Sequence, residues 1–451
     1  MNLEKKNHIA IIGGGWAGLA AAIELCQQNH KVSVFESSPQ LGGRARGIQW
    51  NNKVVDNGQH LMIGAYQQML QLLKILQADT GQLFQQIPHR MLMFDAQSAT
   101  TVFDLQLPTY PAPLHLLFGV LNSPSLSLKE KFLLLLRFNK LLNTKIKTDL
   151  PASEWLARAS LPQSYLKNIL EPVCLAALTT HPQQASAKAF QSVLQQTFNA
   201  PASFTDLLIP TTDLSQVFPA LAEAYILQHG GEIHTRSKVQ ALQVDGEQIK
   251  SIKAGDKFIN VDQVILATPA NITAKLLTDI PACQDIVTQI NQLKYEPICT
   301  LYLQFERAVS LPYPMIGIVN GTAEWIFERK LSGHDDVLAV VISAQGKHLE
   351  MSEATLLKTV YNELSNNIKN LPDILDSKLI TEKRATFQCH PNVDENRPAI
   401  RTNLSNLNIC GDYVYIEENS SPGLPSTLEG ALRSGVKCAQ YLSTPKNKSR
   451  D

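Results

Sequence analysis

Three glycines near the start of the chain, and one acid after them, form the clearest chemical pattern in the sequence. Gly13, Gly15 and Gly18 make the spacing GxGxxG, and Glu36 follows them. The first glycine permits a tight turn, the second lets the backbone approach a pyrophosphate, and the third lets a helix pack on a strand. The carboxylate of Glu36 can accept hydrogen bonds from a ribose diol. The chemistry that these residues indicate is the binding of a dinucleotide.

A second group of polar residues, DNGQH, interrupts the apolar stretch VVDNGQHLMIGA. Gly58 allows close approach of the backbone, and the side chains of Gln59 and His60 are suited to face a bound ring or an alcohol. Because imidazole titrates near neutral pH, His60 is our candidate catalytic residue, as a proton donor. The alternative is a histidine with only a structural hydrogen bond. We expect Asp56 and Asn57 to secure the turn.

The elements around the first glycines read as a strand, a turn, a helix and a second strand. The apolar HIAII at residues 8–12 suits a buried parallel strand, and KVSVF at 31–35 suits its neighbour. Apolar residues recur at helical spacing between them, and we expect Asn29 to end the helix. The N-terminus of such a helix presents free N–H groups and a positive dipole end to phosphates. The whole unit predicts a dinucleotide site far more specifically than the glycines alone.

A second glycine motif, LGGRAR, follows Glu36 closely. Gly43 permits close approach of the backbone, and the guanidinium of Arg44 suits phosphate oxygens. In isolation the motif could equally be a glycine turn with a solvated arginine. Beside the first fingerprint it indicates a phosphate contact.

Near the C-terminus, LNICGD predicts a short buried strand that ends in Gly411 and Asp412. The segment STLEGALRSG then begins an amphipathic helix, which Ser426 or Thr427 can cap. Glu429 stands at the spacing from Ser426 that a capping box requires. A terminal helix that only packs on a sheet is the alternative to a helix that faces a cofactor.

With these motifs the chain resembles the superfamily of FAD-dependent amine oxidases and phytoene desaturases. The resemblance implies FAD as the cofactor, with Arg44 near phosphate or flavin and Asp412 at the ribityl or phosphate region. It also implies that the terminal helix points at the flavin pyrimidine, where its dipole favours negative charge. Val239, in a predicted hairpin of KVQALQV and IKSIKA, is implied to contact the adenine through its backbone. The residues implied to bind FAD are Gly13, Gly15, Trp16, Ala17, Gly18, Glu36, Gly43, Arg44, Gly58, Gln59, His60, Val239, Gly411, Asp412, Ser426 and Thr427.

The fold that the resemblance implies is α/β, with a Rossmann-like FAD-binding domain of the amine oxidase and phytoene desaturase type. A substrate domain of mixed sheet and helix is inserted into it. We expect the FAD-binding domain to be discontinuous, over residues 1–85, 210–275 and 385–445. The substrate domain then takes residues 86–209 and 276–384.

The first insertion is rich in apolar residues. Two apolar runs, PLHLLFGVL and FLLLLRFNKLL, are separated by a polar stretch, so neither reaches the roughly 20 residues of a transmembrane helix. The second run is apolar on almost every face. One interpretation is a buried domain helix, and the other is a helix that lines an apolar tunnel or dips into a membrane face. The segments that follow, ILEPVCLAALTTHPQQASA and AFQSVLQQTFNAPASF, offer few charged groups to grip a polar substrate. The resemblance implies a long apolar isoprenoid as substrate.

The start of the terminal helix separates the branches of the superfamily. Amine oxidases usually place an aromatic residue there to cage the substrate amine, whereas this chain has Thr427. Through DNGQHLMIGAY, EPVCLAALTTHPQQASA and GLPSTLEGALRSG, the chain resembles the hydroxysqualene dehydroxylases, a family of squalene-associated FAD-dependent desaturases. The resemblance implies reduction of hydroxysqualene to squalene by hydride transfer from reduced FAD, on the route to hopanoids. A phytoene- or carotene-type desaturase and a non-catalytic prenyl-binding protein are the alternatives.

Composition and charge exclude some classes of ligand and indicate where the protein works. Lys+Arg and Asp+Glu both number 40, so no net basic field attracts nucleic acid. The seven cysteines are scattered without a metal-like cluster, which predicts no metal site and a reducing compartment. We expect a cytoplasmic protein, with peripheral contact at the inner face of the membrane as an option. No second GxGxxG offers a nicotinamide site, so we expect an external reductant.

Overall fold

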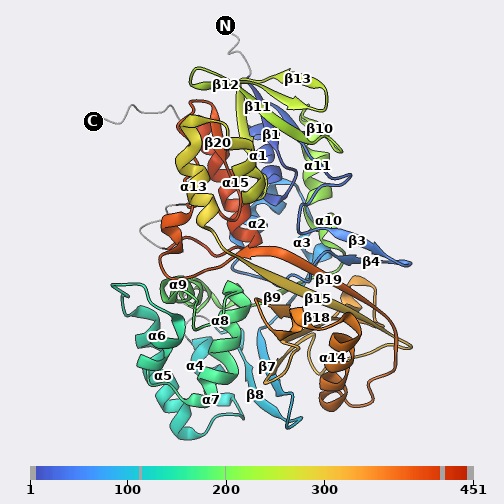
Figure 1. Cartoon of the computed structure of the whole chain (residues 1–451). Coiled ribbons are helices and arrows are strands. Elements are labelled where there is room, and N and C mark those ends of the chain that lie inside the picture. The colour runs from blue at the N-terminus through green and yellow to red at the C-terminus, as the bar shows by residue number, and fades with distance from the viewer. Residues whose placement is uncertain (1–6, 111–113, 199, 417–421, 444–451) are drawn as a thin grey trace.

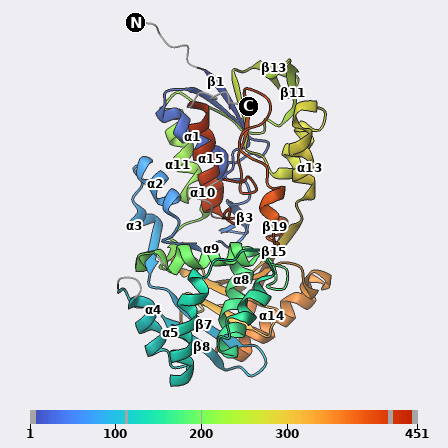
Figure 2. The ribbon, with the colours of Figure 1, turned by 90° about the vertical axis from the view of Figure 1, so that its left-hand side faces the viewer.

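In the computed structural model, the chain forms an upper and a lower part (Figure 1 and Figure 2). The structure describes residues 7–110, 114–198, 200–416 and 422–443. The upper part is built on a five-stranded parallel sheet in the order β10 (Glu232–His234), β2 (Lys31–Phe35), β1 (His8–Ile12), β14 (Gln263–Leu266) and β20 (Leu407–Ile409). Its central strands β2, β1 and β14 are buried over nearly all of their residues, as a parallel sheet between helices requires. The predicted Rossmann-like α/β fold is confirmed.

Helices pack around this sheet: α1 (Trp16–Gln27), α10 (Leu214–Val217), α11 (Pro219–Gln228), α12 (Ala270–Leu277), α13 (Gln284–Gln292) and α15 (Leu428–Ser443). The prediction that Asn29 ends the first helix is confirmed, since α1 stops just before it and its φ is +60°. Helices α1 and α15 lie side by side (Figure 1). Only glycine fits at position 435 between them, because a Cβ there would lie 2.1 Å from the carbonyl oxygen of Ala17.

A small antiparallel sheet caps the top of the upper part. It contains β11 (Val239–Asp245), β12 (Gln248–Ala254) and β13 (Lys257–Asn260). The predicted hairpin of β11 and β12 is confirmed, and its turn contains Gly246 at φ +59°. Such a φ favours glycine because it carries no Cβ.

The lower part is built on a seven-stranded sheet in the order β19 (Ile374–Phe387), β15 (Tyr295–Phe305), β18 (Val337–Ser343), β17 (Trp325–Glu328), β16 (Met315–Val319), β7 (Arg90–Asp95) and β8 (Thr101–Gln106). All its pairs are antiparallel except β16 with β7. Helix α14 (Glu353–Asn367) buries Leu356, Val360 and Leu364 in the apolar cluster of this sheet. Figure 1 shows β19 running between the two parts.

A helical layer completes the lower part. Its members are α4 (Leu114–Asn122), α5 (Leu128–Asn143), α6 (Ala152–Arg158), α7 (Gln163–Tyr165), a π-helical turn (Leu166–Leu170), α8 (Glu171–Leu178) and α9 (Ala187–Phe198). The interpretation of FLLLLRFNKLL as a buried domain helix holds for only one side of the helix. Helix α5 buries Leu134 and Phe138 but exposes Phe132 and Leu136 on its opposite face. Within the described residues, no helix is both long and apolar enough to cross a membrane.

Short strands and helices connect the two parts. They are the hairpin β3 (Gly47–Trp50) and β4 (Lys53–Asp56), the sheet β5 (Met62–Ile63), β9 (Leu207–Pro210) and β6 (Phe84–Ile87), and helices α2 (Gln67–Ile75) and α3 (Thr80–Leu83). The motif EPVCLAALTT ends next to β19, where the N–H of Cys389 donates to the hydroxyl of Thr180 at 2.9 Å. The polar segment DNGQH follows β4 and lies against β15, since the Tyr302 hydroxyl donates to the Asp56 carbonyl at 3.0 Å.

We propose the domain division that the sequence predicted. The parallel sheet takes its strands from residues 1–85, 210–275 and 385–445, and the seven-stranded sheet takes nearly all of its residues from 86–209 and 276–384. Each sheet has its own set of covering helices, which supports two folding units along a discontinuous chain.

Candidate functional site

The two glycine motifs pack against each other at the carboxyl end of β1. Gly13 has φ +113°, and a Cβ there would lie 2.5 Å from the carbonyl oxygen of Ala267. A Cβ at Gly18 would lie 2.1 Å from the Gly13 carbonyl oxygen. Gly43 has φ +60°, and a Cβ there would lie 3.2 Å from the Cα of Gly15. The result is a surface of bare backbone, which is what a pyrophosphate needs for close approach.

The start of α1 has N–H groups to offer at this surface. Its N-cap is Gly15, and among the described residues no side chain caps it. The side chains of Trp16 and Ala17 are buried, and the Trp16 indole N–H donates to the Ala45 carbonyl at 2.9 Å. Trp16 and Ala17 therefore hold the helix in place, while the first-turn N–H groups stay available to an anion.

The acid at the end of β2 is buried and already organised. The Glu36 carboxylate accepts hydrogen bonds from the N–H of Gly14 at 2.8 Å and of Ser38 at 2.7 Å. The backbone carbonyl of Glu36 accepts from the N–H of Ser237 at 2.8 Å. This contact brings the segment before β11 alongside the acid, and with it Val239, which is buried at the start of that strand.

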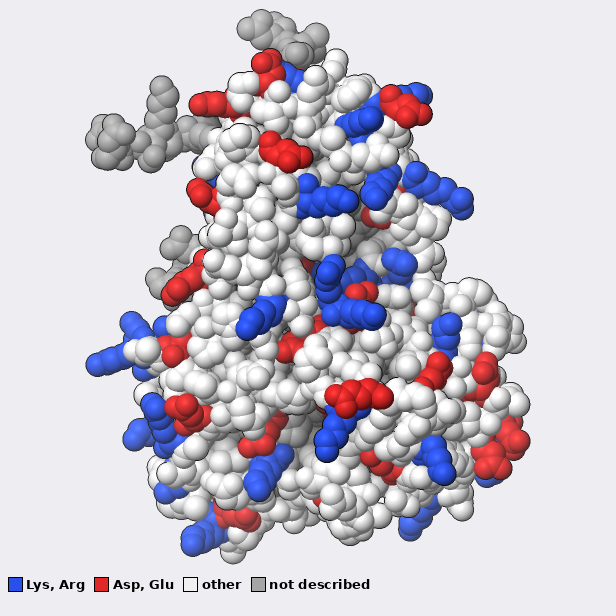
Figure 3. All heavy atoms as spheres, viewed as in Figure 1, with Lys and Arg blue, Asp and Glu red and all other residues white. Residues whose placement is uncertain are grey.

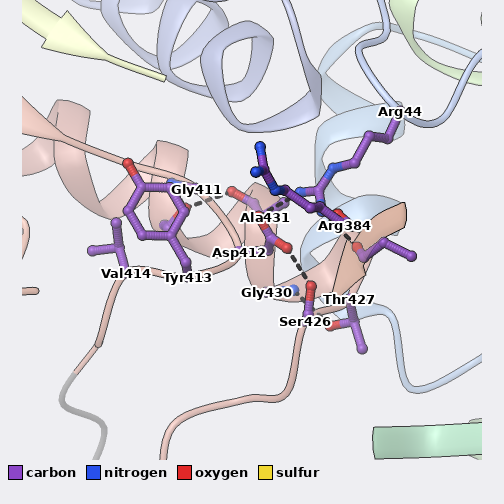
Figure 4. Close-up of polar contacts among 12 residues, drawn as sticks. Arg44, Arg384, Gly411, Asp412, Tyr413, Val414, Ser426, Thr427, Gly430 and Ala431 are labelled. Carbon is purple, nitrogen blue, oxygen red and sulfur yellow. Dashed lines mark hydrogen bonds and ion pairs between the residues drawn. The ribbon is translucent and has the colours of Figure 1, made fainter. Parts of the chain in front are cut away.

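Arg44 and Asp412 meet although they are far apart in the sequence (Figure 4). The Arg44 guanidinium lies 2.6 Å from the Asp412 carboxylate and also donates to the Ala385 carbonyl at 2.5 Å. The Ser426 hydroxyl donates to the other Asp412 oxygen. Burial raises the pKa of Asp412, but Arg44 and Ser426 outweigh it, so this pKa lies below its ordinary value. The pair is therefore charged at neutral pH.

A pocket opens beside this ion pair. Its lining residues are Arg44, Pro269, Ala270, Asn271, Tyr295, Arg384, Phe387, Asp412 and Tyr413. Burial, followed by the charge of Asp412, raises the pKa of Tyr295 to about 12, so the phenol stays protonated. The predicted motifs GGR and GD thus form one wall, and β15 and β19 supply the other side.

The N-terminus of α15 is capped by Thr427, whose hydroxyl accepts from the N–H of Gly430 at 3.0 Å. The predicted capping box of Ser426 and Glu429 is wrong. The Glu429 carboxylate instead accepts from two backbone N–H groups at the start of α2, at 2.9 and 3.2 Å. Those orphan donors belong to a distant helix, so the sequence spacing could not reveal them. The N–H of Gly411 is tied to α15 by the Ser434 hydroxyl at 2.9 Å.

The segment after β4 is held by backbone and side-chain hydrogen bonds. The N–H of Gln59 donates to the Thr300 hydroxyl at 3.3 Å, and Nδ1 of His60 lies 2.7 Å from the Gly58 carbonyl. A carbonyl only accepts, so Nδ1 carries a proton and Nε2 is the nitrogen that titrates. Burial lowers the pKa of His60, and the hydrogen bond to Gly58 and the charge of Asp56 offset this effect only in part. The imidazole ring is therefore mainly neutral at pH 7. Its pKa lies below the near-neutral value expected from the sequence.

Below this segment lies a buried ion pair that the sequence did not reveal. Nη2 of Arg329 lies 2.9 Å from the carboxylate of Asp56, and the two side chains are 2% and 1% exposed. Nη1 of Arg329 donates to the side-chain oxygen of Gln59 at 2.8 Å. The Asp56 carboxylate also accepts from the N–H of Leu214 at 2.8 Å, so Asp56 is a buried anchor. The expected turn-securing role fits Asn57, whose amide donates to the Arg44 carbonyl at 3.2 Å.

Most of the predicted residues form two groups. Gly13, Gly15, Gly18, Gly43 and Glu36 form the glycine end, with Val239 beside the acid. Arg44, Asp412, Gly411, Ser426 and Thr427 meet at the start of α15, and His60 lies within the electrostatic reach of Arg44. The bare backbone, the free N–H groups of α1 and the ribose-type acid fit an FAD. Within the described residues, no group of three His, Cys, Asp or Glu side chains could hold a metal.

Comparisons with known proteins agree with this geometry. The family described as flavin containing amine oxidoreductase matches residues 16–443. The hydroxysqualene dehydroxylase of Zymomonas mobilis is 27% identical, over 95% of this chain and 97% of the relative. A chloroplastic 15-cis-phytoene desaturase of Glycine max is 24% identical, over 97% of this chain and 80% of the relative. Among solved structures, an oxidoreductase from Methanosarcina mazei superposes with a TM-score of 0.76 at 15% identity, over 97% of this chain and 100% of that one.

Proposed function

Because this chain belongs to the flavin containing amine oxidoreductase family and is an FAD-dependent oxidoreductase, we propose that it reduces hydroxysqualene to squalene. The observation that carries the proposal is the similarity to hydroxysqualene dehydroxylases along the whole length of both chains. Three such relatives are 24–27% identical and are covered over 97–99% of their length. The pathway we propose is squalene and hopanoid biosynthesis.

An amine substrate fits this site poorly. The position at which amine oxidases are expected to present an aromatic cage is Thr427, whose hydroxyl is used as the cap of α15. A small hydroxyl residue offers no ring face to an ammonium group. The preference for an apolar isoprenoid therefore agrees with the named activities of the relatives.

We assign the FAD-binding roles as follows. The backbone of Gly13, Gly15, Gly18 and Gly43 receives the pyrophosphate, and Glu36 receives the ribose. The backbone at Val239 meets the adenine. At the other end Arg44, Gly411, Asp412, Ser426 and Thr427 would hold the ribityl and flavin region, together with Gly58, Gln59 and His60. Bound FAD, once reduced by an external two-electron donor, supplies the hydride that replaces the hydroxyl.

The protein's part in the reaction is to deliver a proton to the leaving hydroxyl group. Loss of the allylic hydroxyl as water requires one proton, and we assign its delivery to Nε2 of His60, since Nδ1 is held by the Gly58 carbonyl. The carbon–oxygen bond breaks, water leaves with that proton, and a new carbon–hydrogen bond forms. His60 must be protonated to act, and its lowered pKa makes the protonated form a minority at pH 7.

A phytoene- or carotene-type desaturase is the second candidate. The similarity to plant and cyanobacterial phytoene desaturases, at 22–24% identity, favours it. Both candidates need the same cofactor site and the same class of substrate, and they differ in the direction of electron flow. A non-catalytic prenyl-binding protein is the weaker alternative, because the glycine surface and Glu36 are intact. An isoprenoid substrate partitions into bilayers, so peripheral membrane contact is part of the proposal.

Product analysis tests the proposal. Purified flavoprotein is incubated without oxygen with hydroxysqualene and dithionite, and in parallel with phytoene and a quinone. We expect squalene in the first reaction and no desaturated carotenoid in the second. Gly43→Ala, which disturbs the glycine surface, serves as the matched control and should form little squalene. Desaturated product without squalene would replace the proposal by the second candidate, and a protein that takes up no FAD would leave only the third.

A further inference from the structure

Large apolar side chains are exposed mainly in one place. Among the described residues, 13 large hydrophobic side chains are exposed, and seven of them lie between residues 110 and 136. They are Tyr110, Leu114, Phe118, Leu121, Leu128, Phe132 and Leu136, and we call them the α4–α5 apolar face. Single exposed hydrophobic residues are normal on a protein surface, but a contiguous set marks an interaction site.

The spacing of these residues places them on one side of each helix. Leu114, Phe118 and Leu121 recur at helical spacing on α4. On α5 the exposed residues are Leu128, Phe132 and Leu136, which are 85%, 67% and 62% exposed. The opposite side of α5 is buried in the core through Leu134, Phe138, Leu141 and Leu142. The exposed apolar residues are therefore not needed to pack α5 against the core.

Hydrogen bonds hold the turn between the two helices. Ser127 and Glu130 form a capping box at the start of α5. The ammonium of Lys131 donates to the Leu121 carbonyl, the last turn of α4, at 2.7 Å. The rings of Tyr110 and Phe118 lie 5.1 Å apart. These contacts hold α4 and α5 against each other and place Tyr110 beside α4.

Basic side chains accompany the apolar face. Between residues 110 and 147 the chain has six lysines and arginines against one glutamate, although the whole chain has no net charge. Figure 3 shows basic side chains along the lower left edge, where Figure 1 places α5. Protein–protein interfaces are depleted in lysine, whereas lysine beside exposed Leu and Phe is typical of helices that lie on anionic membranes.

We propose that the α4–α5 apolar face docks the protein on a bilayer of anionic phospholipid. The apolar side chains of α4 and α5 enter the boundary between headgroups and acyl chains, and the lysines of α5 meet the lipid phosphates. This inference deepens the proposed function and rests on it for its purpose, since an isoprenoid substrate is held in a membrane. The binding itself requires only the face and the lipid.

Vesicle flotation tests the docking with the full-length flavoprotein. The vesicles contain either phosphatidylcholine alone or phosphatidylcholine with 30% phosphatidylglycerol (about one charge in three lipids). We expect the protein to float with the anionic vesicles and Leu128→Ser/Phe132→Ser/Leu136→Ser to lose binding at least tenfold. The matched control Leu227→Ser/Phe258→Ser/Leu375→Ser, at positions 51%, 60% and 64% exposed elsewhere, should bind within twofold of the wild type. No flotation of the wild type, or equal losses in both triple variants, would overturn the proposal.

Two further measurements distinguish an anionic membrane from a second copy of the chain as the partner of the α4–α5 apolar face. Lys129→Gln/Lys140→Gln/Lys145→Gln/Lys147→Gln should weaken binding to anionic vesicles, and the matched change at Lys250, Lys257, Lys358 and Lys369 should not. Light scattering after gel filtration reports the mass in solution. If the wild type is a dimer and Leu128→Ser/Phe132→Ser/Leu136→Ser is a monomer, a second copy covers the face. This result would refute docking on a membrane. Squalene formation from detergent-dispersed hydroxysqualene stays normal in that variant if only docking has failed, so the two proposals fail independently.

Discussion

Replacement of Arg329 by methionine should destabilise the protein strongly, because it leaves a carboxylate buried without its partner. Asp56 and Arg329 are 1% and 2% exposed, and their charged atoms lie 2.9 Å apart. Removal of one member of such a pair costs about 3–5 kcal/mol, since the remaining charge loses its partner in a low dielectric. The side-chain oxygen of Gln59 loses its donor in the same variant. We therefore expect a lower unfolding midpoint and a weaker hold on FAD.

The matched control for this change is Arg158→Met. Arg158 forms a comparable ion pair with Glu154 at 3.5 Å, but the two side chains are 70% and 58% exposed. An exposed pair of this kind contributes about 0.3–0.5 kcal/mol. Urea unfolding followed by tryptophan and flavin fluorescence measures both variants. A difference between them below about 1 kcal/mol would refute the reasoning from burial.

A double variant isolates the unpaired charge as the cause. Asp56→Asn removes the charge while keeping an oxygen that can accept from the Leu214 N–H. Arg329→Met/Asp56→Asn should therefore be more stable than Arg329→Met alone, by part of the same about 3–5 kcal/mol. If the second change instead adds to the loss, the cost comes from packing around the guanidinium stem and the ion pair is not its source.

Three further predictions test the cofactor site and the proton donor. Gly43→Ala should lower FAD affinity about tenfold or more, which is ~1.4 kcal/mol. The control is Gly246→Ala, since Gly246 has nearly the same φ but open space around it. This control should retain its flavin absorbance after gel filtration. Wild-type turnover should rise as pH falls towards the lowered pKa of His60, because the protonated form is the donor. The variant His60→Gln should lose this pH dependence and turn over about 10²–10⁴ times more slowly. A wild-type turnover that does not change with pH would exclude His60 as the donor. Thr427→Ala should cost about 1 kcal/mol of stability in urea unfolding, while Ser426→Ala should keep the cap of α15 and lose flavin instead.

Much of the cofactor site could be predicted because its information is local. The glycines of the first motif are needed by turns and contacts within a few residues of them, and the strand, helix and strand around them follow from short periodic patterns. The hairpin of β11 and β12 likewise follows from alternation around a turn that contains Gly246. Such features leave the same signal in any chain that forms them.

The errors share one cause, which is contact between segments distant in the chain. Glu429 stands at the right spacing for a capping box, but the open N–H groups of α2 bind it instead. The run FLLLLRFNKLL is apolar on almost every face, which favours a buried helix, yet the fold buries only one side of α5. Arg329 gave no signal at all, because its partner Asp56 lies in another domain segment.

The flavin family and the parallel sheet could be predicted from the amino-acid sequence, and so could the position that we propose for the dinucleotide. Each of these depends on residue types at short, regular spacing. Three features became visible only in the folded chain: Arg44 pairs with Asp412, Arg329 pairs with the buried Asp56, and the pKa of His60 is lowered. The tertiary structure also decided which apolar side chains stay exposed on α4 and α5. The physical reason is that charge pairing, desolvation and burial depend on which surfaces meet in space, and spacing along the chain does not specify this.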